Sequence, residues 1–464
     1  MVKNLEPYYE DSNEMLNWYV NLPGRRSFLK NSIYCATGTL LMGSNLLSFG
    51  CKTSMPFTNK DLPRHILLRS GWQVENIGDI AHTPAMLALI EKYIPNTKVT
   101  FWPFYDYLPD NEVAMLNKRF PALQIVQGKL DVEGKASNPE LGAAIASADL
   151  LLHNSGPATI AWADLANFKK MTGKPFGIFG VSYGLYGTPE TATLSDAAFV
   201  YFRDSVSLQK AKEAGVAAVT GLSPDAAFAI DVLDDTKAAK FLKENGLADK
   251  KFLCCIPKHR STPVWLHTHK NRPFDAAKNA RNEAMKEHDH QPMREAIIQI
   301  ARTTELKILI CHEDETQMPI GKEWILDKLP QDVKPKVVWL NRPWLTDEAV
   351  SIYKRSAGLF SNEMHSPIMC IAHGIPAIVC RWEEQSSKGI MWKDIGLSDW
   401  LFDFDNEEEI KGFVPAVMEM AKNPKLANTK AAAAKKLVEA RLANSMQQVE
   451  VSSRKNEKIT SSKL

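Results

Sequence analysis

The sequence has no excess of charge of either sign. Its 464 residues include 56 lysines and arginines against 54 aspartates and glutamates, which leaves a formal net charge of +2. Proteins that bind nucleic acid by electrostatic attraction carry a basic patch and a markedly positive charge. We therefore expect no nucleic-acid partner.

Cysteines are few, and no two of the seven have the C-x-x-C spacing of zinc and redox sites. Five of them lie in or beside apolar runs, as core residues do: Cys254, Cys255, Cys311, Cys370 and Cys380. Five histidines crowd one predicted loop, but its lysines and arginines favour an anionic substrate over a cation. These histidines are His259, His267, His269, His288 and His290. We expect neither a metal ion nor a disulfide framework.

Long apolar runs are also missing. The mildly apolar stretch from Ile33 to Phe49 has 17 residues, whereas a membrane-spanning helix needs about 20 strongly apolar ones. Directly before it, Gly24-Arg25-Arg26-Ser27-Phe28-Leu29-Lys30 resembles a twin-arginine export signal. We expect export through the twin-arginine machinery to the periplasm. A cytosolic N-terminal helix with a chance Arg-Arg pair is the alternative.

Cys51 ends this stretch, where a lipoprotein signal places its acylated residue. Ser48 stands where leucine is usual, so simple cleavage nearby is an alternative to lipidation. Lipid chains on Cys51 would anchor the protein to a membrane. We assign residues 1–51 to the signal and 52–63 to a linker.

From Arg64 onward, short apolar runs alternate with amphipathic stretches, which is the pattern of βαβ units. The chain is also long enough for two domains. The pattern predicts an α/β protein with two Rossmann-like domains, residues 64–235 and 250–405, and a ligand cleft between them. Residues 406–464 are expected to form helices and, after Ser445, a frayed polar tail. Predicted strands are His65–Arg69, Lys98–Trp102, Ala148–His153, Phe176–Val181, Phe199–Phe202, Val216–Thr220, Phe252–Ile256, Lys307–Cys311, Lys336–Leu340, Gly358–Phe360 and Pro376–Cys380.

Parallel sheets bind ligands at the carboxyl ends of their strands, where helix N-termini present N–H groups. Polar residues and glycines that follow the strands of the first domain are therefore candidates for substrate binding. They are Asn76, Gly78, Asp79, Asn154, Ser155, Gly156, Ser182, Tyr183 and Arg203. Gly78 suits a tight turn, and Ser155 and Gly156 offer N–H groups to an anion. Arg203 suits a carboxylate or phosphate. Helix capping is the alternative for the loops, and an ion pair with a nearby acid is the alternative for Arg203.

In the second domain, His365 lies at a predicted strand–helix junction. The ordinary pKa of histidine is near neutrality, so we expect His365 to act as a general acid or base. Glu363 is expected to orient His365 or to act as a second acid or base. A helix-capping or core histidine is the alternative.

Five features, in this order along the chain, resemble the polysaccharide pyruvyl transferase family. They are N-x-G-D at Asn76 to Asp79, G-x-S-x-G at Gly180 to Gly184, R-D-x-x-S at Arg203 to Ser207, S-P-D at Ser223 to Asp225, and the His365 helix with Gly374-Ile375-Pro376. The resemblance implies a fold similar to the two-domain glycosyltransferases of the GT-B class. It also implies transfer of a pyruvyl group from phosphoenolpyruvate to two hydroxyls of a polysaccharide or oligosaccharide, as a cyclic ketal. No separate cofactor is implied.

Two features depart from this family. The family has arginine at the position of Glu363, so Lys258, Arg381 or Lys388 is needed to supply a cation beside His365. Phosphoenolpyruvate is also a cytosolic metabolite, whereas the signal directs the protein out of the cytosol. Two other functions therefore stay open: an exported glycan hydrolase that uses Glu363 and His365, and a glycan-binding lipoprotein without activity.

The export signal predicts where the protein accumulates in cells. Replacing Arg25 and Arg26 with lysine is expected to retain the protein in the cytosol, measured by fractionation, while the wild type is exported. Equal cytosolic retention of both would contradict export. Palmitate labelling that is lost in Cys51→Ala would test the lipid anchor separately.

Overall fold

The computed structural model describes residues 64–454 apart from 72, 106 and 185–187. The predicted signal, linker and Cys51 lie outside these residues and stay predictions. Among the described helices, none combines the length and apolar character needed to cross a membrane.

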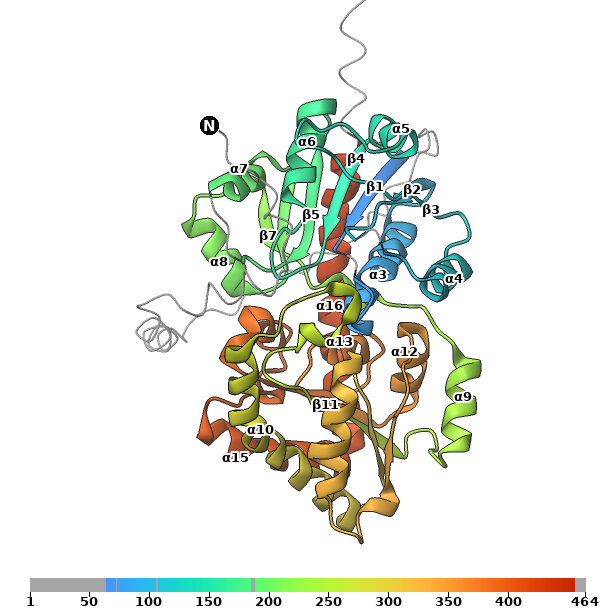
Figure 1. Ribbon diagram of the computed structural model, residues 1–464, viewed down its shortest axis with the longest axis vertical. Coiled ribbons are helices and arrows are strands. Elements are labelled where there is room, and N and C mark those ends of the chain that lie inside the picture. The colour runs from blue at the N-terminus through green and yellow to red at the C-terminus, as the bar shows by residue number, and fades with distance from the viewer. Residues whose placement is uncertain (1–63, 72, 106, 185–187, 455–464) are drawn as a thin grey trace, which may run out of the picture. The chain divides into compact units, whose positions relative to one another are not determined.

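The first sheet contains seven parallel strands in the order β3-β2-β1-β4-β5-β6-β7 (Figure 1). The strands are β1 (Arg64–Ser70), β2 (Thr97–Phe101), β3 (Gln124–Ile125), β4 (Leu150–Asn154), β5 (Phe176–Val181), β6 (Phe199–Phe202) and β7 (Thr220–Leu222). The helices are α3 (Ile77–Tyr93), α4 (Asp110–Arg119), α5 (Pro139–Ser147), α6 (Trp162–Thr172), α7 (Thr188–Asp196) and α8 (Ser205–Glu213). Strand order reverses between β1 and β4, the position at which such sheets bind ligands. We call residues 64–222 the first lobe.

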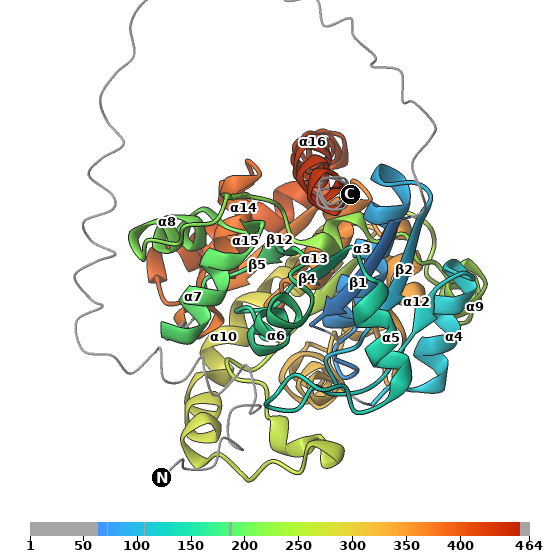
Figure 2. The ribbon, with the colours of Figure 1, turned by 90° about the horizontal axis from the view of Figure 1, so that it is seen from above.

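The second sheet contains six parallel strands in the order β10-β9-β8-β11-β12-β13. The strands are β8 (Phe252–Ile256), β9 (Lys307–Ile310), β10 (Val337–Trp339), β11 (Gly358–Ser361), β12 (Ala377–Arg381) and β13 (Leu401–Asp403). The main helices are α9 (Asp235–Glu244), α10 (Ala276–Thr303), α12 (Thr346–Arg355), α13 (His365–Ala372), α14 (Ile390–Asp394) and α15 (Glu407–Lys422) (Figure 2). In this sheet the strand order reverses between β8 and β11, and β11 is the strand that precedes α13 in the chain. We call residues 252–403 the second lobe.

The two parallel sheets confirm the predicted fold class. Strands buried on both faces read as continuous apolar runs, which is why most were found in the sequence. The strand predicted at Val216–Thr220 is misplaced, because the sheet pairs Thr220–Leu222 with β6 instead. The predicted histidine-rich loop is also wrong in part, since His288 and His290 lie on α10.

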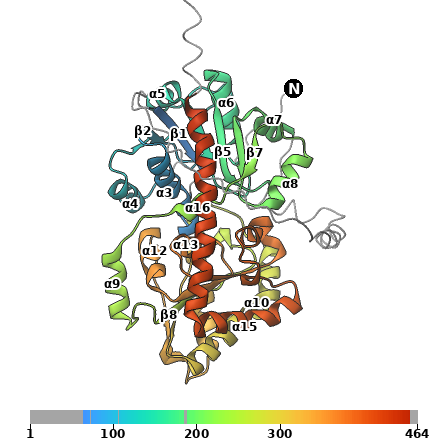
Figure 3. The same cartoon turned by 180° about the vertical axis from the view of Figure 1, so that it is seen from behind.

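The prediction of a polar tail after Ser445 is wrong for residues 446–454, because helix α16 runs from Pro424 to Arg454. Met446 and Val449 are fully buried, so the last turns of this helix pack against the body. Helix α16 contacts β1 and α3 of the first lobe and α13 of the second (Figure 3). It therefore packs against a strand and a helix of the first lobe and a helix of the second.

Glu112, on α4, is a buried carboxyl group without a counter-charge. It is 3% exposed, and its Oε2 has no hydrogen-bond partner among the described residues. Burial, together with the nearby Glu75 carboxylate, raises its pKa from 4.5 to about 8. The folded protein therefore holds a proton at neutral pH that the unfolded chain releases.

Between the unfolded pKa and about 8, the folded state binds the extra proton, so this group makes stability fall as pH rises. Replacing Glu112 with glutamine is expected to remove this fall in stability, which amounts to up to about 4 kcal/mol in the free energy of unfolding. Thermal melting of both proteins at about pH 5 and pH 9 measures it. Identical pH dependence in the two proteins would contradict the raised pKa.

Candidate functional site

The first turn of α3 is fixed to the second lobe by two hydrogen bonds at the backbone of Ile77. The Ile77 N–H donates to the Glu313 carbonyl at 2.9 Å, and the Thr346 hydroxyl donates to the Ile77 carbonyl at 2.7 Å. The Asn76 side chain caps the helix by accepting from the N–H groups of Gly78 and Asp79 at 2.7 and 3.2 Å. These hydrogen bonds hold the first turn of α3 in position.

Gly78 lies directly against His365. A Cβ placed on Gly78 would lie 2.1 Å from the His365 Cβ, which no side chain can tolerate. The glycine was expected to serve a tight turn. The structure gives a different reason, because the missing side chain lets the N-terminal turns of α3 and α13 meet.

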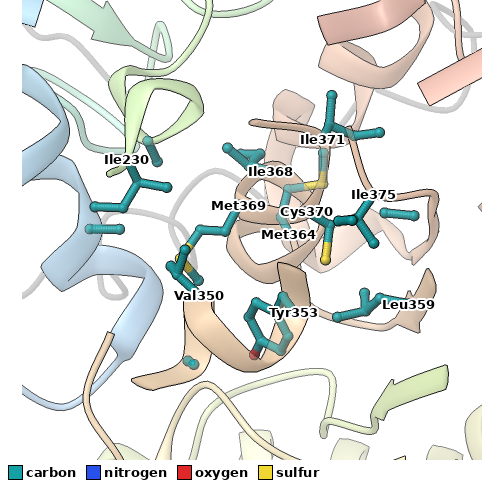
Figure 4. Packing of buried hydrophobic residues seen from close by; sticks show 14 of the residues in the cluster. Ile230, Val350, Tyr353, Leu359, Met364, Ile368, Met369, Cys370, Ile371 and Ile375 are labelled. Atoms are coloured by element: carbon teal, nitrogen blue, oxygen red, sulfur yellow. The ribbon is translucent and has the colours of Figure 1, made fainter. Parts of the chain in front are cut away.

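Helix α13 is held from the opposite side by apolar packing (Figure 4). Ile368, Met369 and Ile371 are fully buried, and they pack with Val350 and Tyr353 of α12 in the same core. The helix therefore has little freedom to move, and His365 at its first position is fixed.

His365 is buried and sits between a cation and two carboxyl groups. The Lys388 ammonium lies 2.5 Å from its Nε2, while Asp79 and Glu313 oxygens lie 3.5 and 3.6 Å from its Nδ1. Burial and the charge of Lys388 lower the pKa of His365 well below its ordinary value. The imidazole is therefore neutral at pH 7. Because Lys388 lies closer to Nε2 than to Nδ1, at 2.5 against 3.3 Å, we place the ring proton on Nδ1, facing the carboxyl groups.

Arg203 belongs to a buried network in the first lobe. Its guanidinium donates to Asp225 and to the Ser182 hydroxyl, each at 2.8 Å. Burial alone would raise the pKa of Asp225, but His82 and Arg203 hold it well below its ordinary value. The His82 ring lies 4.7 Å from the His365 ring, edge to face. This network therefore reaches His365 directly.

Glu363 does not leave a bare negative charge beside His365. Lys258 lies 2.9 Å from its Oε1, and the Gln317 amide donates to the same oxygen at 2.6 Å. Burial raises the pKa of Glu363, while Lys258 opposes that effect. The unfavourable charge expected from the sequence is thus balanced within the second lobe.

Lys388 is the cation that lies on His365. It is partly buried in the short helical segment Glu383–Gly389. Desolvation and the nearby Arg203 lower its pKa to about 8, so it stays mostly charged at neutral pH. Among the residues that the structure describes, no carboxylate forms a salt bridge with it at 4.0 Å or less.

Asp79, His82 and His365 place three potential metal-ligand atoms within 4.8 Å of one another. However, the Lys388 ammonium is already hydrogen-bonded to Nε2 of His365, and His82 Nε2 lies 3.2 Å from Asp225. A cation bound there would have to displace a lysine. We therefore base no chemistry on a metal ion.

The remaining residues that the sequence predicted for the site lie partly in the first lobe and partly in the second. Asn154 donates to the His82 carbonyl at 3.1 Å, and the Ser155 N–H donates to the Phe179 carbonyl, so that N–H is not offered to an anion. The Tyr183 ring packs against Phe202. Gly156 has a φ of +130°, which favours glycine. In the second lobe, Arg381 donates to Asp403 at 2.5 Å.

Glu313 and His82 belong to the site but are not among the residues predicted from the sequence. Glu313 follows β9 and is 1% exposed, so the rule that selected strand ends in the first lobe would have found it. His82 lies on the second turn of α3, and no local pattern distinguishes it from a core residue. Packing between the lobes brings His82 to His365, whereas Glu313 reaches it from the segment after β9 of the same lobe.

A sequence model of the polysaccharide pyruvyl transferase family matches residues 76–384. The chain belongs to this family. The match confirms the resemblance carried by the motifs from Asn76 to the His365 helix. No curated protein sequence matches the chain.

Solved structures with low sequence identity share the fold of this family member. A Listeria monocytogenes protein assigned as a UDP-N-acetylglucosamine 2-epimerase is 12% identical, with a TM-score of 0.54 over 83% of this chain and 95% of that chain. A glycosyltransferase from Rickettsia africae ESF-5 is 11% identical, with a TM-score of 0.50 over 85% and 99%. The UDP complex of MnaA from S. aureus is 10% identical, with a TM-score of 0.50 over 83% and 98%. These likenesses confirm the two-domain fold.

The contact at Gly78 predicts the effect of adding one methyl group. Gly78→Ala is expected to destabilise the protein by about 1–3 kcal/mol, because α3 and α13 must separate. Denaturant unfolding measures this change. In the control Gly142→Ala, on α5, the nearest atom to the new Cβ is 3.8 Å away, so stability should stay equal or rise slightly. Equal stability of Gly78→Ala and wild type would contradict the contact.

Proposed function

We propose that this protein is a glycan-modifying transferase that moves the pyruvyl group of phosphoenolpyruvate onto two hydroxyls of a glycan as a ketal. The observation that carries this proposal is the position of Lys388. Its charged ammonium rests on a neutral imidazole rather than on a carboxylate. A partly desolvated cation that has no salt bridge within the described part of the chain favours the binding of an anion.

Phosphoenolpyruvate suits this arrangement, because its carboxylate and its phosphate are both attached to the same carbon, C2. Lys388 supplies a point charge, and Arg203 is close enough to lower the pKa of Lys388. Once an anion is bound, its charge offsets the mutual repulsion of these two cations. The arginine missing at the position of Glu363 is replaced, in this account, by Lys388.

His365 is suited to accept a proton rather than to donate one, because it is neutral at pH 7. When Lys388 turns to a bound anion, Nε2 of His365 is left to accept the proton of an attacking glycan hydroxyl. Asp79 and Glu313 face Nδ1 and stabilise the imidazolium that results.

The family match favours a transferase over a hydrolase or a silent binding protein. The geometry agrees, because Glu363 is tied to Lys258 and Gln317 rather than presented to a substrate. We retain export to the periplasm, with anchoring through Cys51, as a separate proposal that rests on the twin-arginine sequence. An exported transferase would meet phosphoenolpyruvate only before export, or would use another anionic donor.

Donor binding provides a direct test of Lys388. Lys388→Ala is expected to weaken phosphoenolpyruvate binding about 10–100-fold, measured by calorimetry at about pH 7. Since the pKa of Lys388 is about 8, wild-type binding should also weaken above that pH, and the variant should lose this dependence.

The matched control is Lys411→Ala, which removes an exposed lysine of α15 that pairs only with Glu408 in the same helix. This control should bind phosphoenolpyruvate as the wild type does. Unchanged affinity in Lys388→Ala, or absence of binding by the wild type, would contradict the proposed donor site.

A further inference from the structure

Glu313 presents an unpaired carboxyl oxygen inside the site. It is 1% exposed, and its Oε1 accepts a hydrogen bond from the N–H of Ser366 in the first turn of α13. Its Oε2 is buried, has no hydrogen-bond partner among the described residues, and lies 3.6 Å from His365 Nδ1. A buried polar atom without a partner is costly, which points to a role in binding or catalysis.

Glu313 and Glu363 lie near each other but differ in their partners. Glu363 has the Lys258 ammonium at 2.9 Å, whereas no lysine or arginine lies within salt-bridge distance of Glu313 in the described part of the chain. Burial raises the pKa of Glu313, partly opposed by Lys388 and by its hydrogen bond from Ser366. Of the two acids, Glu313 is therefore the one that has no cationic partner among the described residues and whose Oε2 faces His365.

The proposed reaction needs such a donor, because C3 of phosphoenolpyruvate gains a hydrogen when the enol becomes the methyl group of a ketal. Neutral His365 accepts protons, and Lys388 is held by the donor's anion. We propose that Glu313 is the general acid that protonates C3 of the enolpyruvyl group. This inference rests on the proposed function and assigns the proton donor within it.

The proton transfers balance over two steps. In the first, the C2–C3 π electrons take the proton of Glu313, a glycan oxygen bonds to C2, and that hydroxyl's proton passes to His365. In the second, the bond from C2 to the phosphate oxygen breaks and its electrons leave with phosphate. The second glycan hydroxyl then bonds to C2 and returns a proton to Glu313, while His365 gives its proton to the departing phosphate.

The test follows hydrogen at C3. Phosphoenolpyruvate is incubated with the full-length protein in deuterium oxide, alone and with methyl glucopyranoside and methyl galactopyranoside, which carry 4,6-diols. Proton NMR measures how much deuterium enters C3 and how much ketal is formed. It also measures pyruvate, which forms where water takes the place of the glycan. Glu313→Gln keeps an oxygen for Ser366 but cannot donate a proton as an acid. We expect this variant to incorporate deuterium and to form product about 10²–10⁴-fold more slowly than the wild type. Its affinity for phosphoenolpyruvate, measured by calorimetry, should be unchanged.

Glu313→Asp, which keeps an acid on a shorter side chain, should recover part of the rate. The control Glu112→Gln neutralises another buried glutamate with a raised pKa and should match the wild type. Turnover by Glu313→Gln within a few-fold of wild type would overturn the inference, as would loss of donor affinity in that variant. Wild-type protein that binds phosphoenolpyruvate but shows no deuterium at C3 would also overturn it. Failure of the wild type to bind phosphoenolpyruvate would instead overturn the proposed function.

Discussion

The close approach of Gly78 to His365 is the constraint on which the site depends. Two helices from different lobes meet end to end there, with no room for a side chain on the glycine. The capping of α3 by Asn76, and the hydrogen bond from Ile77 to the Glu313 carbonyl, fix one side of this contact. The apolar face of α13 fixes the other. As a result, Asp79 from the first lobe and Glu313 from the second face the same ring nitrogen.

Two of the three cations at this contact have a carboxylate partner. Arg203 is balanced by Asp225 and Lys258 by Glu363, whereas Lys388 lies on a neutral histidine. The charge of Lys388 therefore lies beside the proposed base, where an anionic donor would be attracted. Lys388 is also partly exposed, while His365 and Glu313 are buried.

Much of the fold could be predicted from the sequence, because both sheets consist of buried parallel strands that read as apolar runs. Short edge strands such as β3 and β13 were not predicted, since two or three residues carry no periodicity. The end of α16 was misjudged because its polar sequence includes isolated core residues such as Met446 and Val449. Packing against both lobes, rather than local preference, makes that segment helical to Arg454.

The candidate site was predictable only in part. The rule of strand ends selected Arg203, Asp79 and His365, which the structure brings into one inter-lobe network. The same rule assigned Gly78 to a tight turn rather than to its contact with His365, and it found no partner for the charge of Glu363. Both features depend on residues from distant segments of the chain. The sequence indicates Lys388 only as one of three cations that can replace the missing arginine. Its distance to His365 could not follow from spacing along the chain.

We propose that Lys388, Arg203 and His365 together hold an anionic pyruvyl donor. A crystal structure of the protein soaked with phosphoenolpyruvate tests this arrangement. We expect the donor between the two lobes, with its phosphate or carboxylate on Lys388 and Arg203, and with C3 facing Glu313. The proposed arrangement is wrong if the donor binds elsewhere, or if no donor binds at saturating concentration and Lys388 stays on His365.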